Sequence, residues 1–355
     1  MAKEIVLSGI RSTGNLHLGN YYGALRNFVR MQDDYDCNFF IADLHALTTN
    51  PDPQQLHASV KQILAEYLAA GLDPEKSTIY IQSDIPEVSE LYLLLNMHVG
   101  IGELMRTASF KDKARKALGI GPATEGADDE AFEHQIIGAE TNKRVNAGLL
   151  TYPTLMAVDI LIQKATKVPV GKDQEQHLEL TRRFARRFNS FYGVDLFPEP
   201  QNYNFGAAAV KVPGLDGSGK MGKSEGNCIY LIDDPKVLRK KVMRAVTDEG
   251  PKEPNQPVSQ PVANLFSLME LTSAPEVVAH YRQAYADCSI RYGDLKKQLA
   301  EDILAVTTPI RERINDILAN EDYLRRVVAD GAERARARAA ATLAEVRQVM
   351  GIRKF

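Results

Sequence analysis

Tryptophan is absent from this chain of 355 residues, and cysteine occurs only three times. Cys37, Cys228 and Cys288 lie far apart in the sequence, which fits neither a disulfide framework nor the ligand spacing of a metal site. The sequence shows no signal peptide and no apolar run long enough to cross a membrane. We therefore expect a cytoplasmic protein with reduced thiols, no metal site of its own and no association with membranes.

No charge of one sign dominates, since 43 lysines and arginines stand against 46 acidic residues and leave a net charge of −3. Such a balance does not by itself indicate nucleic-acid binding, so any contact with RNA must come from local basic patches. An apolar content of 44% is that of a globular protein, and the length is sufficient for one large domain or two ordinary ones.

The first segment with a chemical pattern is residues 4–27. Residues 5–10 form a short apolar run with β-branched side chains, which predicts a buried parallel strand. Turn-forming residues follow at 11–15, and apolar residues then recur at helical spacing from Leu16. The start of such a helix offers unpaired N–H groups and a positive dipole end to an anion.

Three residues of this turn are suited to a ligand. His17 and Asn20 would add hydrogen-bond donors, and Gly19 would let a flat ligand approach the backbone closely. An ordinary strand–turn–helix unit with a surface histidine explains the same residues equally well, so this segment alone does not decide between the two interpretations.

A glycine-rich segment at 215–227 is the second pattern. Its four glycines predict a mobile loop. Lys220 and Lys223 are compact charges on long stems, which suit phosphate oxygens. Taken alone, a loop of this kind is usually only solvated.

Further short apolar runs at 37–42, 77–82 and 167–170 predict three more strands, separated by helical patterns. This alternation predicts an α/β fold with a Rossmann-like, doubly wound parallel sheet. From about residue 235 to the end the pattern is helical only, which predicts a C-terminal all-helical domain.

Polar residues follow two of these predicted strands. Asp43 and His45 come after the strand at 37–42, and Gly171, Asp173 and Gln174 come after the strand at 167–170. We expect them at the carboxyl edge of the sheet, where open α/β folds bind their ligands.

A helix with a mixed face is predicted to begin at Thr151, with Pro153 in its first turn. Tyr152, Met156 and Asp159 follow at intervals that place them on one face of that helix. Asp159 stands among apolar residues, so it is either exposed or buried and paired. The aromatic ring and thioether beside it favour a pocket that holds a flat ring and reads one N–H group.

Other segments allow two interpretations each. Residues 89–100 are apolar on too many sides for a surface helix and lie either deep in the core or at a subunit interface. Residues 119–142 predict a long loop or an insert. The four arginines between 182 and 187 are either a solvated helix face or a phosphate-contacting stripe. The basic segment 324–355 is a solvated helix face or, as we favour, a surface for the RNA backbone.

The order of the two patterned segments, HLGN at 17–20 and KMGKS at 220–224, resembles the HIGH and KMSKS signatures of the class I aminoacyl-tRNA synthetases. Segments spread over nearly the whole chain resemble the tryptophanyl-tRNA synthetase family, among them TGNLHLGNYYGAL, GELMRTASFKDK, GLLTYPTLMAVDIL and VPVGKDQEQHLELTR. The resemblance implies a class I catalytic domain over 1–228, a helical tRNA anticodon-binding domain over 229–355 and a homodimer. It also implies ATP with Mg²⁺, L-tryptophan and tRNA(Trp) as partners. In the implied reaction, tryptophan is activated to tryptophanyl-adenylate and transferred to the 3′ end of the tRNA.

The resemblance further implies roles for individual residues. Tryptophan would be bound by Leu7, His45, Tyr152, Met156, Asp159, Val170 and Gln174. In that set Asp159 accepts the indole N–H, while Tyr152 and Gln174 hold the α-amino group. ATP would be bound by Arg11, Ser12, Thr13, Gly19, Asn20, Gly171, Asp173, Lys220, Met221, Lys223 and Ser224. The catalytic groups would be Lys113, Lys220, Lys223, His17 and Asn20, with the three lysines gripping the triphosphate.

Three positions depart from the family pattern. Arg11 stands where many relatives have glutamine, Leu7 replaces an aromatic residue, and Gly222 replaces the middle serine of KMSKS. The alternatives are a tyrosyl-tRNA synthetase, a non-catalytic synthetase-like tryptophan sensor or RNA-binding protein, and a plain nucleotidyltransferase. The retained Lys220 and Lys223 argue against an inactive copy, because such a copy has no need of phosphate-binding lysines.

Overall fold

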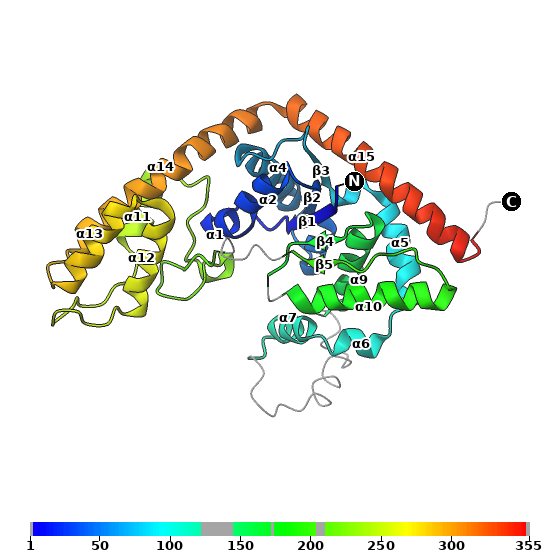
Figure 1. The fold of residues 1–355 in the computed structure, drawn as a ribbon, viewed down its shortest axis with the longest axis horizontal. Helices are drawn as coiled ribbons and strands as arrows, with labels where there is room; N and C mark the ends of the chain where they lie inside the picture. Colours follow the sequence, from blue (N-terminus) through cyan, green and yellow to red (C-terminus); the bar gives the residue numbers. More distant parts are fainter. Residues whose placement is uncertain (1–2, 122–144, 172–173, 204–209, 353–355) are drawn as a thin grey trace.

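The fold is a parallel sheet surrounded by helices, with a helical lobe at one side (Figure 1). The computed structural model describes residues 3–121, 145–171, 174–203 and 210–352. The strands are β1 (Ile5–Arg11), β2 (Asp36–Ala42), β3 (Ser77–Ile81), β4 (Lys167–Val168) and β5 (Gln201–Asn202). Their order is β3-β2-β1-β4-β5 and every neighbouring pair is parallel. The predicted fold class, a Rossmann-like doubly wound α/β sheet with a C-terminal helical region, is confirmed.

The two short strands are where the prediction was least accurate. β4 is shorter than the predicted 167–170, and β5 was not predicted at all. Gln201 and Asn202 carry no apolar pattern, and they are a strand only through their pairing with β4.

Helices connect and cover the strands. In chain order they are α1 (Leu18–Asn20), η1 (Tyr21–Leu25), α2 (Arg26–Met31), α3 (Asp43–Ala46), η2 (Leu47–Thr49), α4 (Pro53–Ala69), η3 (Gln82–Asp84), α5 (Pro86–Asn96), α6 (Ile101–Met105), α7 (Ala108–Leu118), α9 (Ala147–Ile162), α10 (Glu175–Tyr192) and η6 (Lys223–Glu225). The C-terminal region contains α11 (Pro235–Met243), α12 (Gln260–Thr272), α13 (Pro275–Ala286), α14 (Tyr292–Ala319) and α15 (Glu321–Val349).

The helix after β1 is not regular. One continuous helix was predicted from Leu16, but η1 is a π-helical stretch between α1 and α2. Such insertions widen one turn and are frequent at functional sites. Here the irregular turn directly follows the HLGN residues, and the buried Tyr22 within it donates a hydrogen bond to the carbonyl of Leu271 in the helical lobe at 3.0 Å.

The predicted start of α9 was wrong. The helix begins at Ala147 rather than near Thr151, and Pro153 lies inside it. Asn146 is the N-cap, since its side chain accepts a hydrogen bond from Leu149 N–H at 2.8 Å. A good cap therefore sets the helix start six residues, or about 1.7 turns, before the proline.

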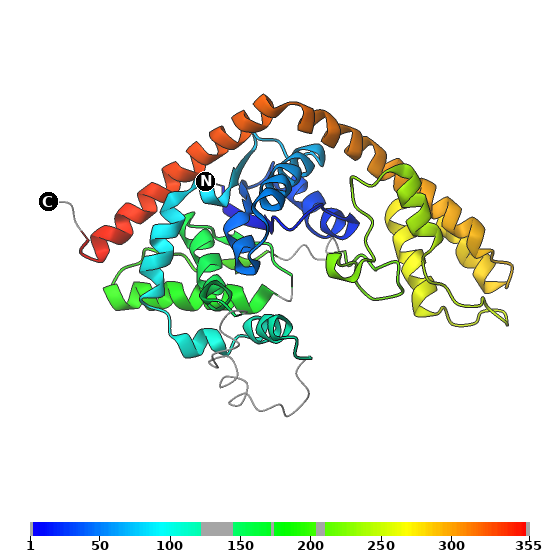
Figure 2. The same ribbon diagram turned by 180° about the vertical axis from the view of Figure 1, so that it is seen from behind.

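The two longest helices, α14 and α15, run over the molecule as an arch (Figures 1 and 2). α14 packs on α11, α12 and α4, and α15 packs on β3, the edge strand, and on α5. At Gly331 the α15 backbone comes so close to β3 that an added Cβ would lie 1.7 Å from the carbonyl oxygen of Ile79. The C-terminal helix thus protects an edge of the sheet that would otherwise be open.

Gly331→Ala is expected to lower the free energy of unfolding by about 2–3 kcal/mol, because the methyl group forces α15 away from β3. Chemical denaturation of the two proteins measures this difference. Gly293→Ala in α14 is the matched control, since nothing lies within 4 Å of the added Cβ there. Its stability should be unchanged or higher by up to ~1 kcal/mol. Equal effects of the two substitutions would contradict the close contact.

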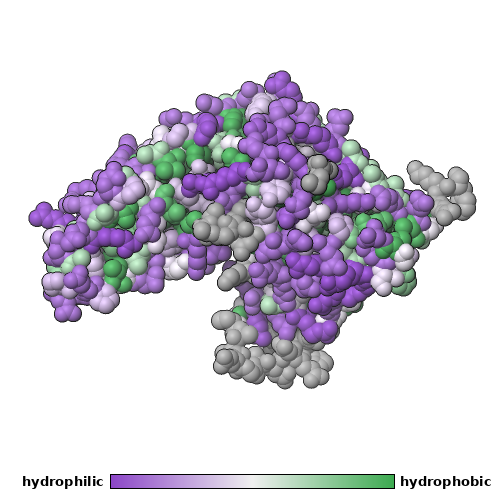
Figure 3. All heavy atoms as spheres, in the orientation of Figure 1, coloured by the Kyte–Doolittle hydropathy of each residue, from purple (hydrophilic) through white to green (hydrophobic). Residues whose placement is uncertain are grey.

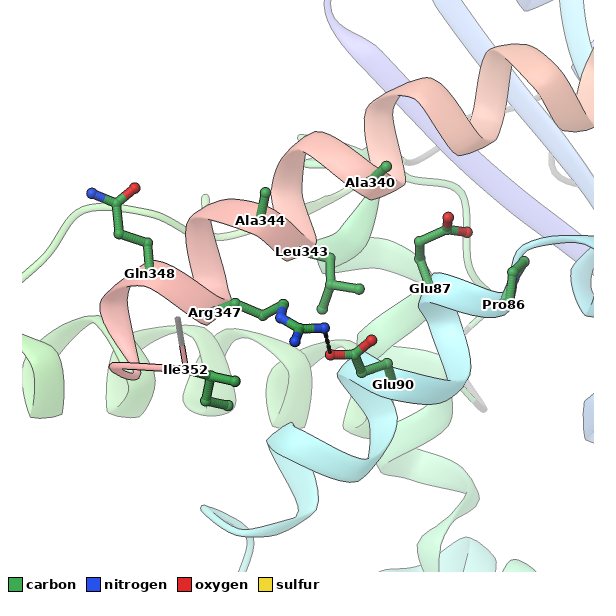
Figure 4. Close-up of a pocket in the computed structure, with 9 residues that line it drawn as sticks. All are labelled: Pro86, Glu87, Glu90, Ala340, Leu343, Ala344, Arg347, Gln348 and Ile352. Carbon is green, nitrogen blue, oxygen red and sulfur yellow. Dashed lines mark hydrogen bonds and ion pairs between the residues drawn. The ribbon is translucent and has the colours of Figure 1, made fainter. Parts of the chain in front are cut away.

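The basic residues of α15 are mostly engaged within the chain. Their partners lie on the sheet, in the loop before β3 and on α5. Arg334 donates to the carbonyls of Pro74 and Ser77, and Arg338 pairs with Asp36. Arg336 and Arg347 pair with Glu87 and Glu90 of α5. Figure 4 shows Arg347 reaching from α15 to Glu90 on α5 along a surface groove. These four side chains are thus engaged within the chain, and the favoured interpretation of 324–355 as an RNA-binding face stays a prediction.

The arginines of α10 are paired as well. Arg182 and Arg186 pair with Glu179 of the same helix, and Arg183 and Arg187 pair with Glu103 of α6. Glu103 is largely buried, so the two ion pairs that it makes attach α10 to α6. All four arginine side chains stay partly exposed, so both interpretations of these arginines stay predictions.

Candidate active site

A cavity of about 400 Å³ opens at the carboxyl ends of β1, β2 and β4, where this type of sheet binds ligands. All seven residues predicted to bind tryptophan line it, namely Leu7, His45, Tyr152, Met156, Asp159, Val170 and Gln174. Arg11, Lys113 and Gly171 also line it. Residues far apart in the sequence thus converge on one pocket, as the interpretation required.

Asp159 is the most strongly held polar group of the cavity. Its side chain is 3% exposed, and its Oδ1 and Oδ2 accept hydrogen bonds from Gln82 Nε2 at 2.8 and 2.9 Å. His45 Nε2 lies 2.9 Å from Oδ2. Of the two alternatives left by the sequence, a buried and paired carboxylate is therefore the observed one.

Gln82 is a partner of Asp159 that the sequence analysis missed. It is fully buried directly after β3, and its Oε1 accepts the backbone N–H of His45 at 3.4 Å. Both the NH₂ group and the carbonyl oxygen of its side chain are therefore hydrogen-bonded, which fixes the orientation of the amide. The signal was present, because a polar residue at the carboxyl end of a parallel strand is what had singled out His45.

Burial and hydrogen bonding act in opposite directions on Asp159. Burial raises the pKa of its carboxyl group, and the hydrogen bonds from His45 and Gln82 counter that rise. The result is a fixed acceptor in a cavity with apolar walls such as Met156 and Val170. Such a site suits a flat apolar ring with a single N–H group.

A second chain of hydrogen-bonded polar residues joins Tyr152 to Gln174, the two side chains predicted to hold the α-amino group. Tyr152 Oη lies 2.8 Å from His177 Nε2, and His177 Nδ1 lies 3.0 Å from Gln174 Oε1. Ser109 Oγ also lies 2.7 Å from His177 Nε2. His177 is fully buried and was not predicted, although it follows Gln174 by three residues at the start of α10 and so lies on the same helix face.

Two cations stand at the cavity. Lys113 Nζ lies 3.5 Å from the centre of the Tyr152 ring. Burial, reinforced by the charge of Arg11, lowers the pKa of Lys113 to about 8. Burial also lowers the pKa of Arg11, whose Nε has no hydrogen-bond partner among the described residues. Two positive groups in a partly desolvated cavity favour an anionic ligand.

The two signature segments meet beside this cavity. Lys223 Nζ donates to the carbonyls of Gly14 at 2.8 Å and Thr13 at 3.3 Å. Burial and the charges of Lys223 and Lys220 lower the pKa of His17 to about 4. His17 is therefore neutral at physiological pH, and its buried Nδ1 has no partner among the described residues.

The turn itself is held by local hydrogen bonds. Asn20 Oδ1 accepts the backbone N–H of His17 at 3.1 Å. The ring of His17 occupies the space beside Gly19, since an added Cβ at Gly19 would lie 2.8 Å from two of its atoms. In this structure Gly19 is thus needed for the contact with His17, and the predicted approach of a flat ligand to Gly19 stays a prediction.

The glycine-rich loop contains its own network of hydrogen bonds. Asn227 ties it together, because its Oδ1 accepts Gly222 N–H at 2.9 Å and its Nδ2 donates to Asp216 and Ser218, both at 3.0 Å, and to the Lys220 carbonyl at 3.2 Å. In this structure the loop is thus folded around one asparagine, and the mobility expected from its four glycines stays a prediction.

The remaining predicted ATP residues lie outside the cavity. They are Ser12, Thr13, Gly19, Asn20, Lys220, Met221, Lys223 and Ser224, which belong to the two signature segments. Met221 is buried, and Ser12 is buried with its Oγ lacking a partner among the described residues. Asp173 and most of the predicted insert at 119–142 fall outside the described residues. In the parts of the chain that are described, no helix is long and apolar enough to span a membrane.

Comparison with known proteins places this geometry in context. The profile of the family described as "tRNA synthetases class I (W and Y)" matches residues 2–307. A tryptophan–tRNA ligase from Porphyromonas gingivalis is 61% identical over 350 residues, which cover 99% of this chain and 100% of that protein.

Two solved structures of tryptophanyl-tRNA synthetases are also similar to this chain over nearly its whole length. Tryptophanyl-tRNA synthetase from Campylobacter jejuni, complexed with ADP and tryptophan, is similar with a TM-score of 0.82 and 31% identity over 98% of this chain and 99% of that one. The enzyme from Mycoplasma pneumoniae is similar with a TM-score of 0.76 and 30% identity, covering 98% of each chain.

Proposed function

The chain belongs to the class I tRNA synthetases for tryptophan and tyrosine, and from this premise we propose that it activates L-tryptophan with ATP and attaches it to tRNA(Trp). The observation that carries the choice of amino acid is Asp159, a buried carboxylate fixed by His45 and Gln82 in an apolar cavity. The relative that shares 61% of its residues bears the name of the tryptophan enzyme, so the tyrosine alternative is not favoured.

Tryptophan enters the cavity with its indole against Met156 and Val170 and its ring N–H directed to Asp159. Phenylalanine has no N–H group and would leave the carboxylate buried without its ligand, which in comparable sites gives rejection by roughly 10⁴–10⁵-fold. Tyr152 and Gln174, joined through His177, lie on one side of the cavity and hold the α-amino group.

The first reaction forms one bond and breaks another at the α-phosphate of ATP. The tryptophan carboxylate attacks that phosphorus in line, pyrophosphate leaves, and tryptophanyl-adenylate remains. No side-chain nucleophile is required, so the protein contributes position and positive charge. Arg11 and Lys113 supply charge at the cavity, and Lys220 and Lys223 supply it from the loop.

Mg²⁺ accompanies the triphosphate in this proposal. The described residues contain no group of three or more acidic, histidine or cysteine side chains able to hold a metal, and Mg²⁺ commonly binds through substrate phosphates. The ion supplies charge neutralisation there, while the lysines orient the same phosphates.

In the second reaction a ribose hydroxyl at the 3′ end of the tRNA takes the aminoacyl group and releases AMP. For a class I enzyme we expect the 2′-hydroxyl. Residues 1–228 form the catalytic domain, and residues 229–355 contribute the anticodon-binding part through α11–α14. Transfer to tRNA supplies the ribosome, and a cytoplasmic location is consistent with that role.

We further infer a homodimer. Leu93, Met97 and Ile101, at the end of α5 and the start of α6, are 56%, 69% and 67% exposed, and Phe191 at the end of α10 is 70% exposed. Figure 3 shows apolar surface gathered at the side of the molecule where α5 lies. Large apolar side chains that cluster on a surface typically mark a protein interface. The two interpretations of residues 89–100 are therefore compatible. One face of α5 is buried in the core, and the other face is exposed and available to a partner.

Amino-acid-dependent ATP–pyrophosphate exchange tests the proposal, with tryptophan, tyrosine and phenylalanine supplied separately. Exchange is expected with tryptophan only, and removal of Mg²⁺ with EDTA should abolish it. Exchange with tyrosine would leave the mechanism intact and refute the pocket assignment. A folded protein without exchange in the presence of Mg²⁺ and any of the three amino acids would point to the sensor or RNA-binding alternative.

A further inference from the structure

Glu66 is a buried acid near the active site that none of the roles above uses. It lies on α4 with a fully buried side chain, in a run where its neighbours Leu64, Tyr67 and Leu68 are buried apolar residues. Because a buried carboxylate costs stability unless it is well paired, its presence at a core position requires an explanation.

One of its two hydrogen-bond partners belongs to the turn between β1 and α1, residues 12–17, which we call the signature turn. Glu66 Oε2 accepts the backbone N–H of Leu16 at 2.9 Å, and Oε1 accepts Gln62 Nε2 at 3.0 Å. Leu16 directly precedes the HLGN residues, so the carboxylate fixes the entry to this turn from within the core.

Lys223 binds the same turn from the KMGKS loop, through the carbonyls of Gly14 and Thr13. Glu66 and Lys223 thus contact the same turn two residues apart, at Leu16 N–H and at the Gly14 carbonyl. Burial raises the pKa of Glu66 to about 7, with Lys223 opposing the rise, and the charge of Glu66 partly offsets the lowering of the Lys223 pKa by burial.

The groups that act on Glu66 are few. They are the neutral amide of Gln62 from α4 itself, the N–H group of Leu16 from the turn, and the ammonium of Lys223 from the loop. Of these only Lys223 carries a charge, and it is also the group that the proposed function sends to the phosphates of ATP.

We propose that Glu66 is a positioning residue for ATP binding. In the free enzyme its negative charge helps to hold Lys223 against the signature turn. When ATP draws Lys223 to its phosphates, Glu66 takes up a proton from solvent. This inference rests on the proposed function, because it assumes that Lys223 binds ATP.

The proposal makes ATP affinity depend on pH through Glu66. At low pH the carboxyl group is already protonated, so release of Lys223 requires no further change. At higher pH the ionised form must either take up a proton or stay charged beside a triphosphate, and both oppose ATP binding. A glutamine at this position keeps an acceptor for Leu16 N–H and removes the charge.

The test compares the parent with Glu66→Gln in tryptophan-dependent pyrophosphate exchange between about pH 6 and pH 9. The ratio of the two KM values for ATP (parent over variant) should be near one at about pH 6 and rise to about fivefold at about pH 8.5. The KM for tryptophan should agree between the two enzymes. A purely structural role would give a ratio that does not change with pH, and that result would overturn the proposal.

A second variant and a direct binding measurement keep the proposal testable if Glu66→Gln does not fold. Gln62→Met removes a hydrogen-bond donor to the Glu66 carboxylate, which should raise the pKa of that group. The pH at which ATP affinity begins to fall should therefore be higher in this variant than in the parent. An unchanged pH dependence would count against the proposal. Calorimetry of ATP binding to Lys113→Arg, in which no lysine titrates at that position, should show proton uptake near pH 8 when two buffers of different ionisation enthalpy are compared. Absence of uptake would refute the proposal even if the enzyme failed to exchange with any amino acid, so the two failures are distinguishable.

Discussion

Asp159→Asn is expected to lower kcat/KM for tryptophan by about 10³-fold, which corresponds to ~4 kcal/mol of lost transition-state stabilisation. The asparagine has nearly the same shape, but its NH₂ group would face the donors Gln82 Nε2 or His45 Nε2. At least one buried polar group is then left without a partner, and the indole N–H loses a charged acceptor. Pyrophosphate exchange at varied tryptophan concentration measures the effect.

The control for this substitution is Thr154→Val in the same helix. Thr154 is fully buried, does not line the cavity, and its Oγ1 has no partner among the described residues. Its exchange activity should match that of the parent within about twofold. Asp159→Asn should also leave the KM for ATP nearly unchanged, because the proposed ATP groups lie elsewhere. A similar loss for ATP and tryptophan would mean that the fold, rather than the amino-acid pocket, had been damaged.

The parts of this site that were predicted from the sequence are those with a pattern of their own. Tyr152, Met156 and Asp159 share a helix face by their spacing alone, and the error of four residues in the start of α9 did not alter that face. His45 follows a strongly apolar strand. Each of these signals is local, so it survives without knowledge of the tertiary structure.

The residues that were missed act through tertiary contacts. Gln82 and His177 are ordinary polar residues in the sequence, and their importance comes from Asp159 and Tyr152, which are 77 and 25 residues away. Asn227 orders a glycine-rich loop whose composition favours mobility. The packing of α15 against the sheet could not be predicted from local sequence either. A glycine at position 331 within a helical pattern does not indicate that strand β3 lies against it.

Lys113→Met is expected to lower kcat/KM for ATP by roughly 10²–10³-fold, the usual loss when a preorganised charge on a developing anion is removed. Lys113 is placed for this role by α7, and it lines the cavity together with Arg11. Lys116→Met, an exposed position on the same helix, removes an equal charge outside the cavity. That control should retain the activity of the parent within about twofold.

The pH dependence of the parent gives the same role a second test. Burial and the nearby Arg11 lower the pKa of Lys113 to about 8, so the side chain is charged below that pH and loses its charge above it. Since kcat/KM reports the free enzyme, its value for ATP should fall as the pH rises beyond about 8. In a Glu66→Gln background, which lacks the buried acid, Lys113→Arg should remove this decline, because a guanidinium remains charged throughout the range. The decline should persist in Glu66→Gln, which separates the effect of Lys113 from that of the buried acid. A decline that persists unchanged in the double variant Glu66→Gln/Lys113→Arg would assign it to another group and would contradict the role given to Lys113.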